Sequence, residues 1–317
     1  MNIQALVLYP QYGLANRLRA LASAKILADY TGRKLFVNWY PSKECNIEWE
    51  ELFVNKLERY STPLSSFQAG INLYDDEHNA DGFYWDMPQS LLSNRADVVA
   101  VHTCRSFQSA RMSQDTYKAA KSLFYKSLQP VSAIQDIVST ILRNYFEGHN
   151  VIGIHVRRTD HLSFTNKDPK VVCPTDLFIE AMTGILKNNP DVKFFLATDD
   201  KEEELLIKGT FGDALIVYEK ATVCTDTKKG IQDALIDWLL LSNTSRILGS
   251  YMSSFTEEAG IVNRVRTDTI PGKERSLVLG THFLLLRNKG LKNYLLYSYY
   301  YRKEQVIGLI KRTLGLK

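Results

Sequence analysis

The sequence predicts an α/β protein built from two doubly wound domains, each a mostly parallel sheet covered by helices. Three observations predict this fold class. Short apolar runs of β-forming residues alternate with helical patterns along the chain. The alternation occurs twice, and the second series begins at Val151. The length of 317 residues suits two α/β domains of ordinary size.

The first series opens with a predicted strand at 3–9, a turn containing Gly13 and a helix that ends at Gly32. Four residues recur at helical spacing in this helix: Leu14, Leu18, Leu21 and Ala22. The predicted elements that follow are strands at 34–39 and 97–102 and a helix at 131–146. Residues 40–96 are rich in aromatic and turn residues and give no clear pattern.

The second series alternates in the same way. Its predicted strands are VIGIHVR (151–157), VKFFLATDD (192–200), ALIVYE (214–219) and RILGS (246–250). Its predicted helices are 174–189, with Thr175 as the N-cap, 230–244 and 253–263. Alternation of this kind favours parallel strands with right-handed crossovers.

Polar groups follow several of these strands, where doubly wound sheets bind their ligands. They lie in the segments YGLANR (12–17), HVRRTDH (155–161), ATDD (197–200) and GSYMSSF (249–255). Two adjacent arginines, Arg157 and Arg158, end a strand that should be buried. They either form salt bridges or bind an anion such as phosphate, which arginine contacts with two N–H groups at once.

The other polar residues also have structural alternatives. Asn16 and Ser253 or Ser254 can cap helices instead of binding a ligand. Asp199 and Asp200 can be helix N-terminal acids or can contact a ribose or base. Asp237, an acid among apolar residues, either pairs internally or binds a polar ligand group.

Composition and charge bound the class of protein. Hydrophobic residues make up 45% and charged residues 23%, as in a soluble globular enzyme. The four cysteines show no C-x-x-C spacing, which favours a reducing compartment over a zinc site or disulfide framework. The first residues lack the pattern of a signal peptide, and no apolar run is long enough to span a membrane. We therefore expect a cytoplasmic protein.

The motif IGIHVRRTD resembles the H-V-R-R-x-D motif of GDP-fucose-dependent fucosyltransferases, a group that includes α1,2-, α1,6- and nodulation-type enzymes and protein O-fucosyltransferase relatives. The segment at 13–39 is similar to the opening of the nodulation-type members, with Gly13 and Ala15 at the family's glycine pair. FFLATDD and ALIDWLLLSNTSRILGSYMSSF resemble the second and third family motifs, in the expected order.

The resemblance implies a GT-B fold with two Rossmann-like domains and a cleft between them. It implies an acceptor-side domain at 1–148, a donor-binding domain at 149–286 and a tail at 287–317. Arg157 would hold the β-phosphate, with Arg158 assisting and with His155 and Asp160 orienting the loop. The remaining implied donor contacts are Asn16, Asp199, Asp200, Asp237, Ser253 and Ser254.

The predicted reaction is an inverting, metal-independent transfer of fucose from GDP-fucose to a glycan. The chain contains no Asp-x-Asp motif to hold a metal ion, so the arginines would stabilise the charge on departing GDP. The general base stays open. Some α1,6-type relatives have a glutamate where this chain has Thr165, and the loop offers His161 and Asp168 instead.

Two alternatives remain for the function: the same fold with another purine nucleotide sugar, or a non-catalytic glycan-binding protein on a decayed transferase fold. No nucleic-acid motif is present, and we expect no nucleic-acid partner. The tail at 287–317 carries a net charge of +7, so the other residues carry −3. Its aromatic and basic residues and its helical apolar stripe either pack on the first domain or attach the enzyme to the inner face of a membrane.

Overall fold

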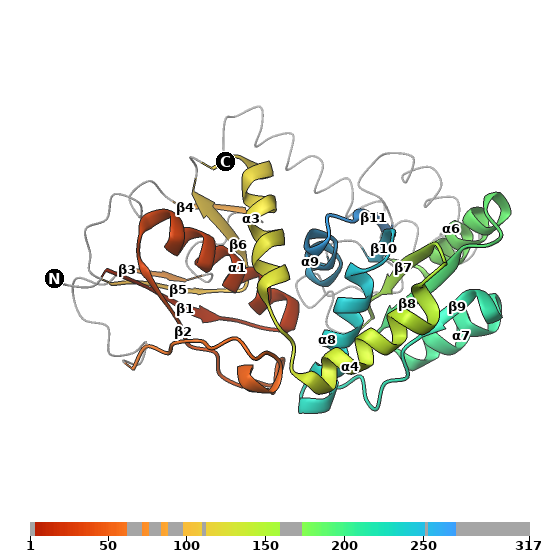
Figure 1. Ribbon diagram of the computed structural model, residues 1–317, viewed down its shortest axis with the longest axis horizontal. Helices are drawn as coiled ribbons and strands as arrows, with labels where there is room; N and C mark the ends of the chain where they lie inside the picture. The colour runs from red at the N-terminus through yellow and green to blue at the C-terminus, as the bar shows by residue number, and fades with distance from the viewer. Residues whose placement is uncertain are drawn as a thin grey trace, which may run out of the picture. The chain divides into compact units, whose positions relative to one another are not determined.

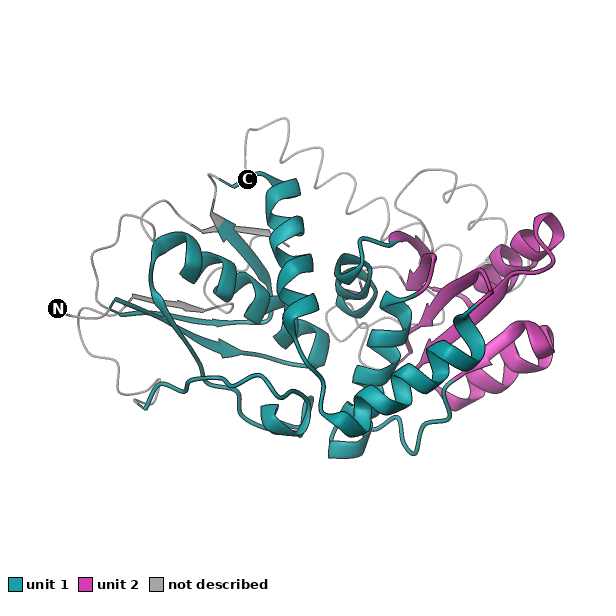
Figure 2. Ribbon diagram, viewed as in Figure 1, with its two compact units in different colours: residues 1–147, 218–243, 254–265 teal, residues 148–217, 244–253, 266–317 magenta. Residues whose placement is uncertain are grey.

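The computed structural model describes residues 4–61, 72–75, 84–87, 98–109, 112–158, 173–250 and 253–270. They form two compact units. Unit 1 falls within Met1–Glu147, Tyr218–Asn243 and Ser254–Val265, and unit 2 within Gly148–Val217, Thr244–Ser253 and Arg266–Lys317 (Figure 2). The domain boundaries predicted from the sequence stay predictions.

Unit 1 contains a parallel four-stranded sheet with the strand order β2-β1-β5-β3 and a separate parallel pair, β4 and β6 (Figure 1). The strands are β1 (Ala5–Pro10), β2 (Lys34–Val37), β3 (Asn72–Asp75), β4 (Tyr84–Met87), β5 (Val98–Thr103) and β6 (Ser106–Ser109). Every residue of β1 is buried, as expected for a central strand covered on both faces.

Helix α1 (Leu14–Thr31) packs against β1 and β2, and the four residues that recur at helical spacing are all buried. It ends at Gly32, whose φ of 67° is the left-handed conformation of a glycine C-cap, as the sequence predicts. Gly13 occupies the N-cap, so Asn16 does not cap this helix. The other helical segments of unit 1 are η1 (Trp49–Glu51), α3 (Gln114–Ser127), α4 (Ser132–Ile141), η3 (Leu142–Phe146), α8 (Lys228–Ser242) and α9 (Ser254–Val262).

A buried ion pair joins α3 to α9. The ammonium of Lys121 lies 2.6 Å from a carboxylate oxygen of Glu258, and both side chains are almost fully excluded from water. The Tyr125 hydroxyl donates a hydrogen bond to the same carboxylate, and burial lowers the pKa of Lys121. Because unpaired buried charges are costly, this contact fixes the packing of α9, the helix that begins at Ser254.

Unit 2 contains a parallel five-stranded sheet with the order β11-β10-β7-β8-β9. Its strands are β7 (Val151–Val156), β8 (Lys193–Thr198), β9 (Leu215–Val217), β10 (Arg246–Ser250) and β11 (Arg266–Ile270). Its helical segments are α6 (Thr175–Asn188), α7 (Lys201–Phe211) and η4 (Gly212–Ala214). The core includes Ile154 of β7, Phe178 of α6 and Leu196 of β8.

The fold class predicted from the sequence is confirmed, and most predicted elements are present. Helices α3 and α7 and strands β3, β4, β6 and β11 were not predicted. Thr175 does not cap α6, as Pro174 is the N-cap. Among the described helices, none is long and apolar enough to cross a membrane.

Candidate functional site

The carboxyl ends of three neighbouring strands bring together three of the predicted segments. Strand β7 is central in its sheet, with β10 on one side and β8 on the other. His155 of β7 lies beside Gly249 of β10 and Ala197 of β8. The segments HVRR, ATDD and GS therefore meet at one edge, as predicted.

Hydrogen bonds from both neighbouring strands hold the backbone of the arginine pair. The Arg157 N–H donates to the Ser250 hydroxyl at 2.9 Å, and the Arg158 N–H donates to the Asp199 carboxylate at 2.7 Å. The Ser250 hydroxyl also donates to the His155 carbonyl at 3.3 Å. The turn after β7 is thus fixed from the ends of β10 and β8 before any ligand arrives.

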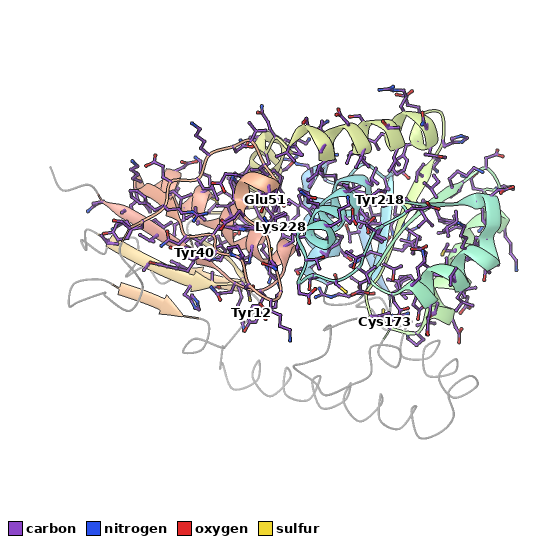
Figure 3. The ribbon with its side chains drawn as sticks, turned by 90° about the horizontal axis from the view of Figure 1, so that it is seen from below. Tyr12, Tyr40, Glu51, Cys173, Tyr218 and Lys228 are labelled. Carbon is purple, nitrogen blue, oxygen red and sulfur yellow. The ribbon has the colours of Figure 1, made fainter. Side chains whose placement is uncertain are left out.

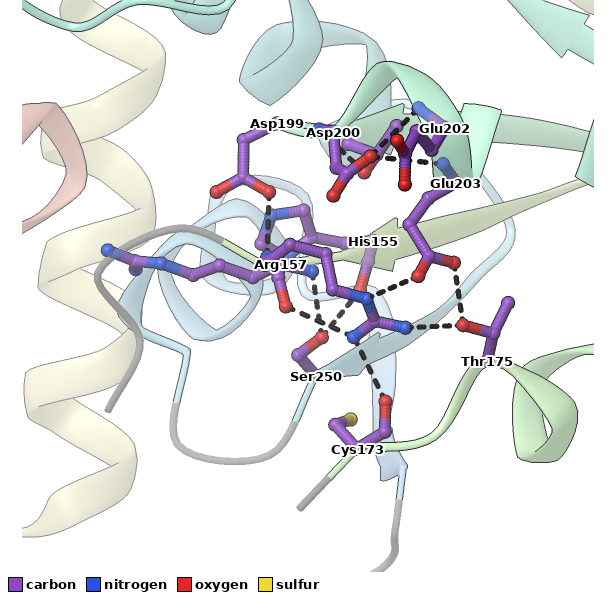
Figure 4. A network of polar contacts seen from close by, with 11 residues as sticks. His155, Arg157, Cys173, Thr175, Asp199, Asp200, Glu202, Glu203 and Ser250 are labelled. Carbon is purple, nitrogen blue, oxygen red and sulfur yellow. Dashed lines mark hydrogen bonds and ion pairs between the residues drawn. The ribbon is translucent and has the colours of Figure 1, made fainter. Parts of the chain in front are cut away.

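The guanidinium of Arg158 is buried, and each of its three nitrogens donates a hydrogen bond to a residue labelled in Figure 4. Its Nε donates to Glu203 at 2.8 Å, and its Nη1 donates to the Cys173 carbonyl at 2.9 Å. Its Nη2 donates to the Thr175 hydroxyl at 2.8 Å, and that hydroxyl donates to Glu203 at 2.6 Å. The ion pair between Arg158 and Glu203 is therefore buried, and hydrogen bonds to Thr175 and Cys173 satisfy its remaining polar atoms.

The side chain of Arg157 extends in the opposite direction, away from Glu203 and Thr175 (Figure 4). It is half-buried, whereas Arg158 is buried. The salt bridge considered for the arginine pair is thus observed for Arg158, and anion binding by Arg157 stays a prediction. Arg158 forms the salt bridge at the strand end, and Arg157 is the arginine presented at the edge of the sheet. The guanidinium of Arg158 is engaged in this network, and its predicted assistance at the phosphate stays a prediction.

The two aspartates after β8 have separate roles in the fold. Asp199 holds the Arg158 backbone, as described above. Asp200 is the N-cap of α7, and its carboxylate accepts from the N–H groups of Glu202 and Glu203 at 2.8 and 3.1 Å. For Asp200 the structural alternative, a helix N-terminal acid, is thus observed. Because Glu203 lies in the capped turn, this cap also positions the partner of Arg158.

We expect Asp200→Ala to lower the free energy of unfolding by about 1 kcal/mol, since two helix N–H groups lose their acceptor. Chemical denaturation monitored by circular dichroism measures this difference. Asp200→Asn is the matched control, because asparagine caps helices as well as aspartate does. Equal destabilisation by both variants would show that the negative charge, and not the cap, carries the effect.

His155 and Ser253 lie at this edge of the unit 2 sheet, and Ser254 follows them along the chain in unit 1. The His155 ring is buried, and its Nδ1 lies 3.4 Å from the Ser253 hydroxyl. Ser253 is fully buried, and Ser254 is the first residue of α9. The predicted contacts of these residues with a donor stay predictions.

Three predicted donor residues belong to unit 1, namely Ser254, Asp237 and Asn16. Asp237 on α8 is buried and pairs with Lys220 at 2.6 Å, so the internal pairing considered for this acid is observed. Asn16, on the first turn of α1, accepts a hydrogen bond from Arg19 at 2.9 Å. The predicted catalytic residues Asp160 and His161 lie outside the described residues, as do Thr165 and Asp168.

Sequence reasoning missed Glu203, Thr175 and Ser250 as parts of this site. Glu203 stands in KEEE, where three consecutive acids gave no sign of which one pairs with Arg158. Ser250 precedes the serines that were considered, and Thr175 was interpreted as a cap. Among the described residues, no three His, Cys, Asp or Glu side chains gather closely enough to hold a metal ion.

No family model matches the chain. It is 26% identical over 175 residues to nodulation protein Z of Bradyrhizobium diazoefficiens, a match that covers 46% of this chain and 44% of that relative's length. The chain thus spans less than half of the curated relative it matches.

Solved structures resemble the chain over most of its length. A GDP co-crystal of the α-1,6-fucosyltransferase NodZ is 20% identical, with a TM-score of 0.53, and the match covers 81% of this chain and 91% of that one. An arginine-to-lysine variant of Arabidopsis thaliana FUT1 with GDP is 15% identical, with a TM-score of 0.55, covering 84% and 70%. POFUT1 with GDP-fucose is 10% identical, with a TM-score of 0.53, covering 84% and 98%. These likenesses show that the chain shares the GT-B fold of these fucosyltransferases, as expected from the sequence.

Proposed function

We propose that this protein transfers fucose from GDP-fucose to a hydroxyl group of a glycan acceptor. The observation that carries the proposal is the arginine turn at the carboxyl edge of β7. It holds one guanidinium inside the domain and presents the other, Arg157, at the edge where doubly wound sheets bind ligands. The fold shared with GDP and GDP-fucose complexes of fucosyltransferases supports the same donor.

The proposed role of Arg157 follows from the charge that develops in the reaction. As the bond between fucose and GDP breaks, the sugar gains oxocarbenium character and negative charge grows on the departing diphosphate. A guanidinium that already faces the phosphate strengthens its hydrogen bonds as this charge grows, which lowers the barrier. The bonds from Ser250 and Asp199 to the turn mean that little reorganisation is needed.

We propose that the transfer inverts the anomeric carbon and needs no metal ion. The resemblance implies inversion, which results when the acceptor hydroxyl attacks the anomeric carbon in a single displacement from the side opposite to GDP. A base must then take the acceptor proton, and His161 and Asp168 stay candidates for it. Asp160 is proposed to orient the loop that carries Arg157.

The direct test is incubation of the purified protein with GDP-fucose and a panel of defined glycans, with GDP release and product mass as readouts. We expect a product heavier by one fucose and stoichiometric GDP. Transfer from a different nucleotide sugar, with none from GDP-fucose, would contradict the proposed donor. Glycan binding without any turnover would support a non-catalytic protein.

Transfer is expected to continue in excess EDTA, because arginine supplies the positive charge that a metal ion supplies in Asp-x-Asp enzymes. The measurement compares initial rates of product formation with and without EDTA. A rate that falls in EDTA and returns on addition of manganese or magnesium would contradict metal independence.

We also propose that the tail at 287–317 places a cytoplasmic enzyme at an anionic membrane surface. The support is its charge and its apolar stripe, since each basic residue near such a surface contributes about 1 kcal/mol. Deleting residues 302–317 should abolish sedimentation with anionic vesicles while transfer to a soluble acceptor continues. Full-length protein that never sediments with these vesicles at low salt would contradict this placement.

A further inference from the structure

Two exposed tyrosines follow the first two strands of unit 1. Tyr12 comes two residues after β1 ends, and Tyr40 comes three residues after β2 ends. The strands are parallel neighbours, so both tyrosines belong to the carboxyl edge of this sheet (Figure 3). Their exposed fractions are 49% and 51%. Half of each large aromatic residue is therefore presented to solvent at an edge suited to ligands.

A single buried arginine fixes the two tyrosines relative to each other. Arg17 is only 3% exposed. Its Nε donates to the Tyr12 carbonyl at 2.7 Å, and its Nη1 donates to the Tyr40 carbonyl at 2.6 Å. Its Nη2 donates to the Ser42 hydroxyl at 2.8 Å. The fork of one rigid guanidinium therefore spans both turns.

The backbone at Tyr12 is held in an unfavourable conformation. Its φ is 61°, a left-handed value that bulky side chains rarely adopt, because the Cβ crowds the backbone. Such strain persists only where the surroundings impose it, and here the Arg17 bond to the Tyr12 carbonyl does so. The Arg17 bond thus holds in place a tyrosine that is half exposed and contributes little to the core.

A carboxylate lies beside the two turns. The Ser42 hydroxyl donates to Glu44 at 2.8 Å, and this bond lowers the pKa of the Glu44 carboxyl. A Cβ atom added at Gly13, next to Tyr12, would lie 3.8 Å from the Glu44 carbonyl oxygen, so the backbone of Glu44 lies close to the Tyr12 turn. On the other side, the Arg59 guanidinium lies 5.6 Å from the centre of the Tyr40 ring. A carboxylate that can accept hydrogen bonds therefore follows Tyr40 along the same turn, and a guanidinium lies over the Tyr40 ring.

We propose that Tyr12 and Tyr40, clamped by Arg17, form a binding site for a pyranose ring of a neutral oligosaccharide. A pyranose has an apolar C–H face that packs on an aromatic ring and hydroxyl groups that donate to a carboxylate such as Glu44. The carboxylate disfavours an anionic occupant such as phosphate. The inference rests on the proposed function, because it assigns this site to the glycan acceptor.

The test removes the rings and leaves the backbone able to fold. Tyr12→Asn suits a left-handed residue, since asparagine tolerates this conformation, and Tyr40→Ala removes the second ring. Tyr30→Ala is the matched control, because Tyr30 is 47% exposed near the other end of α1. Tyr40→Phe keeps the ring without its hydroxyl. Each protein is applied to a printed array of defined neutral oligosaccharides, and its GDP affinity is measured by calorimetry.

We expect at least tenfold weaker binding of the glycans that the wild type prefers in Tyr12→Asn and Tyr40→Ala. Tyr30→Ala and Tyr40→Phe should bind them within a factor of two of the wild type, and all variants should keep their GDP affinity. Wild-type protein that binds no neutral glycan, or ring-free variants that bind as the wild type does, would overturn the site. If no protein binds GDP but the ring-free variants still lose glycans, the pyranose site stands and the proposed donor fails.

Discussion

Arg157→Ala is expected to abolish fucosyl transfer and to weaken GDP binding at least tenfold while leaving the fold intact. The side chain lies outside the closed network of Arg158, so its removal breaks none of that network's side-chain bonds. A hydrogen bond to a charged group contributes about 1.5–3 kcal/mol, which corresponds to roughly a tenfold to hundredfold change in affinity. Calorimetry with GDP and a transfer assay measure the two effects.

Arg157→Lys is the conservative companion of this variant. It keeps the charge but loses the planar, two-pronged contact that a phosphate group accepts from arginine. We expect its transfer rate to stay far below that of the wild type. A folded Arg157→Ala protein with near wild-type turnover would contradict the donor assignment.

Arg158→Ala should have the opposite signature, with a large loss of stability. Its removal leaves the buried Glu203 carboxylate without its cation, and breaking a buried pair in this way costs about 3–5 kcal/mol. The Thr175 hydroxyl and the Cys173 carbonyl lose a donor as well. Thermal and chemical denaturation measure the change, and we expect Arg158→Ala to unfold well before Arg157→Ala.

The double variant Arg158→Met/Glu203→Leu distinguishes the effect of the charges on stability from the effect of the side-chain volume. Apolar residues of similar volume leave no unpaired charge, so the double variant should regain much of the stability lost in Arg158→Ala. An Arg158→Ala protein with the denaturation midpoint of the wild type would show that the network around Arg158 and Glu203 does not stabilise the fold.

The sequence alone predicts the framework of this molecule because its central strands leave strong local signals. Strands β1, β7 and β8 are apolar runs, and α1 has buried residues at helical spacing. The edge strand β11, with the sequence RTDTI, carries no such signal. Helix α7 begins KEEE, and its N-cap Asp200 was considered both as a helix N-terminal acid and as a ligand contact, without a helix being predicted there.

The sequence predicts the parts of the candidate site whose residues are neighbours in the sequence. It does not predict the roles of residues that depend on partners far away along the chain. The motif places two arginines together, yet nothing local distinguishes them. Arg158 turns inward because Glu203 on α7 and Thr175 on α6 meet it there, 45 and 17 residues away. Likewise, the clamp on Tyr12 and Tyr40 depends on one Arg17 side chain reaching two separate turns.

The central claim is that Arg157 binds the diphosphate of the donor, and comparing the affinities of GDP and GMP tests it most directly. The wild type should bind GDP at least tenfold more tightly than GMP, because the second phosphate is the group that Arg157 contacts. In Arg157→Ala this preference should disappear, with GMP affinity unchanged. A variant that still prefers GDP by the wild-type factor would contradict the account.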